Sequence, residues 1–168
     1  MKKALFVIFL VSLVCSAGCG KDDMYLPKAK SDRIYTTVSG GEETHNGDGY
    51  TLTVPVKNYR YEKEYEDGLL EEKWEYTKKD DAEIKVTTYK NTDELEARSR
   101  FLRENDDYIF EDLTGYSLCG TESDGDTLWF NLHETDTATY IVSWKYPENT
   151  SEKLKKELAD IAQTFETE

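Results

Sequence analysis

The chain has 168 residues, of which 35 are acidic and 21 are basic, and its formal net charge at pH 7 is −14. A chain of this length suits one domain that buries roughly 70% of its unfolded surface. The negative charge excludes nucleic acid as a partner, because phosphates within the Debye length of about 8 Å would be repelled.

The N-terminal segment has the pattern of a signal peptide. Lys2 and Lys3 give a basic start, and residues 4–14 form an apolar run. As a helix this run would span only about 16 Å, whereas the hydrocarbon core is about 30 Å thick and takes roughly 20 residues to cross. We therefore expect residues 1–18 to be a leader that is removed, rather than a lasting membrane helix.

Cys19 follows three small residues, Ser, Ala and Gly at positions 16–18. This segment resembles the lipobox of bacterial lipoproteins. The resemblance implies that the thiol of Cys19 carries a diacylglycerol and that the leader is cut just before it. An ordinary secretory leader that leaves Cys19 unmodified is the alternative. Cys15 is the poorer candidate, since bulky Leu13 and Val14 precede it.

The mature chain would begin at Cys19, with a net charge of −16 because two lysines leave with the leader. Cys119 is then the only other thiol, so no intrachain disulfide can form, and we expect Cys119 to be a buried small hydrophobe. Residues 19–33 are polar and predict a lipidated N-terminus and tether. Residues 34–168 are expected to form a single domain, outside the cytoplasm and anchored by lipid to a bacterial cell membrane.

Alternating apolar residues predict a series of strands in this domain. A short strand at residues 33–38 and a loop at 40–49, rich in Gly, Asn and Asp, come first. The further strands are predicted at residues 50–56, 59–66, 70–76, 83–90, 108–113, 116–120, 127–134 and 138–146. Asp67-Gly68 and Asp124-Gly125 are dipeptides that favour hairpin turns.

One helix is predicted mid-chain, over residues 93–104. Asn91 or Thr92 is expected to open it, by the capping preferences of helix N-termini. The side chains expected to face the core are Leu95, Phe101 and Leu102.

A second helix is predicted at the C-terminus, beginning near Ser151. Its apolar residues recur at helical spacing, so this stripe should lie on the sheet. The stripe consists of Leu154, Leu158, Ile161, Ala162 and Phe165. The fold class is therefore α+β, an antiparallel sheet of about seven or eight strands with two packed helices.

The order of elements resembles the PsbP-like superfamily, which includes the DcrB-type bacterial lipoproteins and a photosystem II extrinsic subunit. Residues 50–55, the hairpin over 127–146 with the following Pro147, and residues 161–165 carry the resemblance. It covers about residues 50–166. It implies a role as an envelope or assembly accessory, with no shared catalytic residue.

Catalysis is not predicted. Cys119 and His133 are residue types of a nucleophile and a base, but nothing in their local sequence pairs them. Two histidines and one thiol do not make a structural zinc site. We predict no catalytic residue, no metal ligand and no cofactor.

Two acidic loops leave calcium binding open. Glu122, Asp124 and Asp126 form one, and Asp48 with Glu42 and Glu43 forms the other. Neither matches the twelve-residue calcium loop, and Asp-Gly pairs mark turns more often than metal sites.

Five aromatic residues are the candidate interaction surface, because they share one face of the predicted hairpin over residues 59–76. They are Tyr59, Tyr61, Tyr65, Trp74 and Tyr76. They either pack in the core or form a strip open to a protein, peptide or glycan partner, since Tyr and Trp supply large contact area.

The sequence thus favours a membrane-anchored extracytoplasmic lipoprotein that acts as a non-enzymatic interaction or accessory module of the cell envelope. Its partners would be the membrane, through the lipid, and an envelope protein. The alternative is a ligand- or cation-binding lipoprotein domain. An enzyme whose carboxylates meet only on folding is the third reading.

Overall fold

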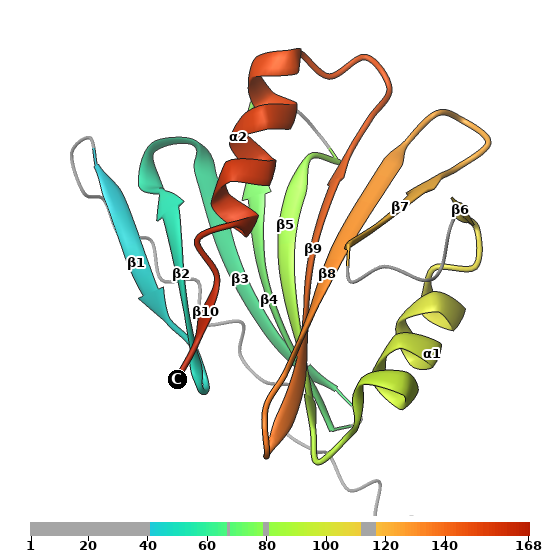
Figure 1. The fold of residues 1–168 in the computed structure, drawn as a ribbon. Helices are drawn as coiled ribbons and strands as arrows, with labels where there is room; N and C mark the ends of the chain where they lie inside the picture. The colour runs from blue at the N-terminus through green and yellow to red at the C-terminus, as the bar shows by residue number, and fades with distance from the viewer. Residues whose placement is uncertain (1–40, 67, 79–80, 112–116) are drawn as a thin grey trace, which may run out of the picture. The chain divides into compact units, whose positions relative to one another are not determined.

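The computed structural model describes residues 41–66, 68–78, 81–111 and 117–168 (Figure 1). The predictions on the leader, on Cys19, on the tether and on the strand at residues 33–38 lie outside this part. Within it the chain forms two α-helices, one short 3-10 helix and ten strands.

The largest element is an antiparallel sheet of seven strands. In spatial order these are β3 (Tyr59–Glu66), β4 (Leu69–Tyr76), β5 (Glu83–Lys90), β9 (Ala138–Tyr146), β8 (Thr127–Glu134), β7 (Ser117–Thr121) and β6 (Ile109–Glu111). Strands β3, β5, β8 and β9 have the predicted bounds. Gly68 and Gly125 lie at the predicted hairpin turns with φ of +83° and +94°, a conformation that glycine adopts without a steric cost.

A second, three-stranded sheet consists of β1 (Glu42–Asn46), β2 (Tyr50–Pro55) and β10 (Glu166–Thr167). The prediction of a loop over residues 40–49 is wrong for β1, whose polar, mostly exposed residues become a strand by pairing with β2. The predicted strand 50–56 ends at Pro55, because Val56–Asn58 form the 3-10 helix η1.

Helix α1 (Glu94–Glu104) begins later than expected. Asp93 caps it by accepting a hydrogen bond from the backbone N–H of Glu96 at 2.9 Å, so the cap is neither Asn91 nor Thr92. Asn91 instead has φ of +52° in the turn that follows β5.

The core-facing side of α1 was only partly predicted. Phe101 is buried, but Leu95 is 75% exposed, since it lies on the side of the helix opposite Ala97. The expectation that Leu95 faces the core is therefore wrong.

Helix α2 (Glu152–Ala162) confirms the predicted C-terminal helix. Ser151 caps it by accepting a hydrogen bond from the N–H of Leu154 at 3.3 Å. All five residues of the predicted stripe are buried, including Phe165, which lies beyond the last helical turn.

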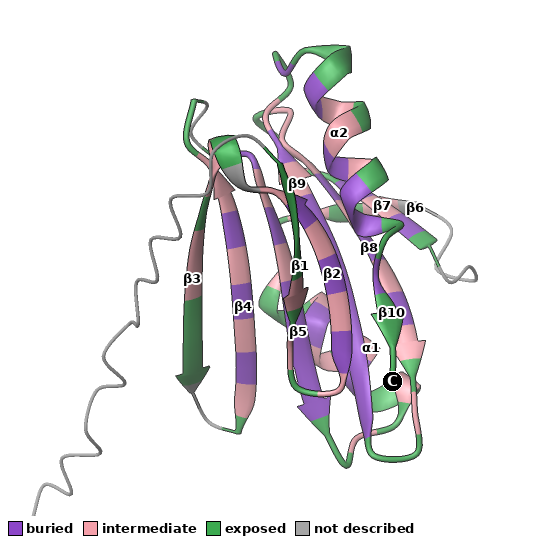
Figure 2. Cartoon of the chain, turned by 90° about the vertical axis from the view of Figure 1, so that its left-hand side faces the viewer, coloured by how far each residue is buried: buried purple, intermediate pink, exposed green. Residues whose placement is uncertain are grey.

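Two apolar cores lie on opposite faces of the seven-stranded sheet. On the α2 face, β2 and α2 pack over alternate residues of β4, β5 and β9, among them Trp74, Val86 and Val142. On the α1 face, Phe101 packs over Phe130 and Ile141. Figure 2 shows alternation of buried and partly exposed residues along β2 and β4, whereas β9, which both cores cover, is buried along almost its whole length. The fold is α+β, with helices on both faces of a mostly antiparallel sheet.

Candidate functional site

The predicted aromatic residues lie on the α2 face of strands β3 and β4. Register places Tyr59 opposite Tyr76 and Tyr61 opposite Trp74. Trp74 is buried in the core, and the three tyrosines paired around it are half-buried against that core. Tyr65 is 60% exposed. Trp74 is therefore not part of an exposed strip, and a binding role for the four tyrosines stays a prediction.

A buried carboxylate beneath these rings was not predicted as a site. Glu72 on β4 is 1% exposed and accepts hydrogen bonds from three side chains. The donors are His45 Nε2 at 3.0 Å, Tyr50 Oη at 2.7 Å and Tyr61 Oη at 2.5 Å. Lys63 Nζ lies 3.3 Å from the same carboxylate. We call these five residues the Glu72 cluster.

The electrostatics of the Glu72 cluster keep the carboxylate ionised. Burial alone would raise the pKa of Glu72, but the hydrogen bonds from His45, Tyr61 and Tyr50 outweigh burial and lower that pKa to about 2. Burial and the nearby carboxylate raise the pKa of Tyr50 above its ordinary value, so its hydroxyl stays a donor. The donors come from β1, β2 and β3, so the cluster joins the small sheet to the large one.

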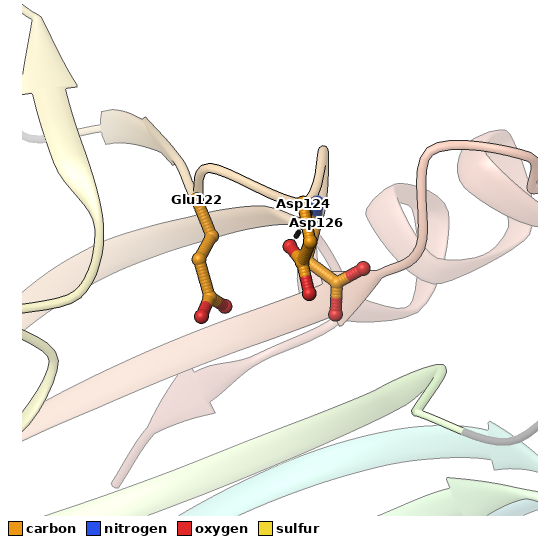
Figure 3. Close-up of side chains that lie close together, drawn as sticks. All are labelled: Glu122, Asp124 and Asp126. Atoms are coloured by element: carbon orange, nitrogen blue, oxygen red, sulfur yellow. Dashed lines mark hydrogen bonds between the residues drawn. The ribbon is translucent and has the colours of Figure 1, made fainter.

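The acidic turn of the β7–β8 hairpin brings Glu122, Asp124 and Asp126 together (Figure 3). Their ligand oxygens lie within 4.8 Å of one another, so these residues could hold a cation. Hydrogen bonds of the turn account for the same geometry. The N–H of Glu122 donates to the carbonyl of Asp126 at 2.9 Å, and Asp124 Oδ1 accepts from the N–H of Asp126 at 3.1 Å.

The other predicted acidic loop has a different arrangement. Asp48 forms an ion pair with Lys90 at 2.6 Å, and Glu42 and Glu43 belong to strand β1. Asp48 therefore already has a counter-ion from β5.

Cys119 and His133 do not form a nucleophile and base pair. Cys119 is half-buried on β7 opposite Trp129, and His133 lies four residues further along β8. At about 3.4 Å per residue, His133 is about 14 Å along β8 from the position opposite Cys119. The ring of His133 packs against Phe165 at 4.6 Å, and burial lowers the pKa of the imidazole. Cys119 is less buried than expected.

Charged residues line the α1 face of strands β3, β4 and β5. Six of them, which we call the open charged face, are half-exposed and joined by cross-strand ion pairs: Arg60, Glu62, Glu71, Lys73, Glu75 and Lys85. Lys73 Nζ lies 3.4 Å from Glu62 and 3.8 Å from Glu75, and Arg60 contacts Glu75. Burial alone would lower the pKa of Lys73, but the surrounding carboxylates raise it.

A groove of about 380 Å³ lies where the open charged face meets helix α1. Its lining combines apolar Leu69 and Phe101 with charged residues of both signs, among them Lys85, Arg100 and Glu104. This composition suits contact with a polar macromolecular surface better than enclosure of an apolar ligand.

No family model matches the sequence, and no curated protein matches it. A solved structure from Bacteroides thetaiotaomicron VPI-5482 is similar over 78% of this chain and 49% of its own, at 16% identity and a TM-score of 0.40. The chain thus spans about half the length of that protein. A likeness at this level says nothing about function. Within the described residues, no helix has the length and apolar character needed to cross a bilayer.

Proposed function

We propose that this protein is a lipoprotein held by a diacylglycerol on Cys19 at the outer side of a bacterial cell membrane. Its folded domain would be a non-enzymatic interaction or accessory module of the cell envelope. The observation that carries the proposal is the N-terminal sequence, in which the apolar run over residues 4–14 leads to three small residues and Cys19.

The physical chemistry of the chain supports anchoring by lipid. Each buried acyl methylene contributes about 0.8 kcal/mol, so two chains hold a protein stably where one gives marginal binding. The net charge of −16 after removal of the leader repels the domain from anionic lipid. The anchor, rather than the domain surface, would keep the protein at the membrane.

Metabolic labelling with an alkyne-bearing palmitate tests the anchor. The wild-type chain should take up label and fractionate with membranes, whereas Cys19→Ala should stay unlabelled and keep its leader. Cys15→Ala is the matched control and should be labelled like the wild type. Label retained in Cys19→Ala would refute the assignment of Cys19.

The open charged face is the surface that best suits a protein partner. Its half-exposed ion pairs on a regular sheet offer donors and acceptors of both signs at fixed spacing, which gives specificity by charge complementarity. Arg60, Lys73 and Lys85 also make this face less negative than the chain as a whole. This mixture of charges supports an interaction role.

Cross-linking in intact cells, followed by affinity purification, tests the interaction role. The full-length protein should capture a specific envelope protein that an unrelated lipoprotein does not. Deleting the ion pair Lys85–Glu71 with Lys85→Ala and Glu71→Ala should reduce capture. Deleting the ion pair Lys156–Asp160 on α2 in the same way is the matched control. Equal loss in both double variants would contradict this use of the face.

The alternative of a ligand- or cation-binding domain would use the acidic turn at Glu122, Asp124 and Asp126. Calcium is the cation whose oxygen preference such a site fits. A calcium titration separates the two functions, because only a cation-binding domain should gain thermal stability from calcium.

A further inference from the structure

Strand β3 ends the seven-stranded sheet on one side. It pairs with β4 over eight residues in a continuous register, from Tyr59 opposite Tyr76 to Glu66 opposite Leu69. Figure 2 shows β3 at the border of the described part, with no described strand or helix beyond it. A long, regular edge of this kind is a template for another strand.

The hydrogen bonds of the hairpin fix which backbone groups of β3 point outward. The N–H of Thr77 donates to the carbonyl of Asn58 at 2.8 Å, and the N–H of Tyr76 donates away from β3, to Ala82. Antiparallel ladders alternate, so even-numbered residues of β3 bond to β4 and odd-numbered residues present their backbone groups at the edge. The outward-facing residues are Tyr59, Tyr61, Lys63 and Tyr65.

We propose that this edge is a self-association surface, at which β3 of two copies of the chain pair antiparallel into one continuous sheet. In the register that we call full overlap, residues 59–65 of one copy pair with residues 65–59 of the other. Tyr59 then lies opposite Tyr65 of the second copy, and Tyr61 lies opposite Lys63. On the other face Arg60 lies opposite Glu64 of the second copy. Glu62 lies on the two-fold axis, opposite Glu62 of the second copy. Every outward-facing residue then meets an outward-facing residue.

The side chains favour this register over its neighbours. Shifting the pairing by two residues in one direction sets Lys63 against itself and Glu62 against Glu64, both of which are like-charge contacts. Shifting it in the other direction leaves Tyr65 unmatched, although Tyr65 is 60% exposed in the single chain. Full overlap forms opposite-charge pairs of Arg60 with Glu64 and covers Tyr65, and such cross-strand pairs stabilise sheets.

Glu62 is the cost of this arrangement. Charges on edge strands commonly discourage pairing, and two glutamates facing each other across the axis repel. Each Glu62 carboxylate, however, lies 3.4 Å from Lys73 Nζ and 3.4 Å from Arg60 Nε of its own chain. These cations offset the negative charge of Glu62 at the axis. Glu62 also lies on the open charged face, which is half-exposed.

Disulfide trapping of the full-length chain in intact cells tests the proposal. Residues opposite each other at the axis form a pair without mutual backbone hydrogen bonds, with Cα atoms about 4.5 Å apart, which is within disulfide range. Glu62→Cys should therefore give a cross-linked dimer on mild oxidation, several-fold above Glu96→Cys on the exposed side of α1. Both variants keep the same native cysteines. No excess of dimer in Glu62→Cys over Glu96→Cys overturns the proposal.

Charge reversal tests the register. In the Glu62→Cys background, Glu64→Arg places two arginines opposite each other and should reduce cross-linking several-fold. Adding Arg60→Glu restores opposite charges and should restore cross-linking. Because Arg60 also contacts Glu75 of its own chain, the fold of each variant is checked by circular dichroism. Undiminished cross-linking in a folded Glu64→Arg chain contradicts the register, whether or not the double variant folds.

Discussion

At the scale of the residue, Glu72 shows how one polar side chain can join two sheets. The sequence places this glutamate among aromatic residues on the inward side of a strand, where an isolated ion would be costly. The structure surrounds it with hydrogen-bond donors from three other strands. Alternation predicts the side of the strand on which Glu72 lies, but not its donors, because His45 and Tyr50 belong to strands that pack on the sheet only in the folded chain.

Replacing Glu72 by glutamine should destabilise the fold by about 2–4 kcal/mol, because the amide presents hydrogens to groups that are themselves donors. Urea unfolding monitored by tryptophan fluorescence measures the loss. Glu43→Gln on exposed strand β1 is the matched control and should change stability by less than about 0.5 kcal/mol. Equal effects of the two changes would show that the Glu72 cluster contributes little.

The Glu72 cluster also predicts a dependence of stability on pH. The pKa of Glu72 is about 2 in the folded chain, below its ordinary value of 4.5, so the folded state binds fewer protons than the unfolded state over that interval. The contribution of Glu72 should be complete above pH 4.5 and decrease as the pH falls towards 2. Urea unfolding of the wild type and of Glu72→Gln across this interval should show their stabilities converge as the pH falls. A constant difference between them would contradict the assignment.

At the scale of the element, the sequence predicts well those strands and helices whose periodicity comes from one buried face. Strand β8 and the stripe of α2 belong to this group. It does not predict β1 or β10, because a polar strand at a sheet edge and a strand of two residues have no periodic apolar signal. The predicted start of α1 was wrong because Asn91, Thr92 and Asp93 are all good capping residues, and only the backbone conformation decides which of them caps the helix.

Substitutions at Asp93 and Thr92 test which residue caps α1. Asp93→Ala should cost about 1 kcal/mol, since the N–H of Glu96 loses its acceptor at the helix N-terminus. Thr92→Ala should cost less, because Thr92 does not cap the helix. Thermal unfolding followed by circular dichroism at 222 nm compares the two variants. A larger loss for Thr92→Ala would restore the cap that the sequence favoured.

The acidic turn of the β7–β8 hairpin is expected to be a turn rather than a calcium site. Its hydrogen bonds already hold Asp124 and Asp126 in place. Millimolar calcium should leave the Tm unchanged. Binding at a hundredfold excess over Kd would add about 2.7 kcal/mol, a shift of several degrees. Such a shift in the wild type that is absent in Asp126→Asn would contradict the turn interpretation and support the cation-binding alternative.

At the scale of the whole molecule, one sheet supports two apolar cores, one on each of its faces. Helix α1 and helix α2 occupy opposite faces, so unfolding of the sheet exposes both cores together. The open charged face and the edge of β3 meet along the same strand. The surfaces proposed above for a protein partner and for self-association therefore share strand β3.

Intact-mass analysis of the protein extracted from membranes tests the proposed lipid anchor. We expect a mature chain that begins at Cys19, lacks residues 1–18 and carries the added mass of a diacylglycerol on that cysteine. A chain that retains Met1, or one that begins at an unmodified Cys19, would contradict it.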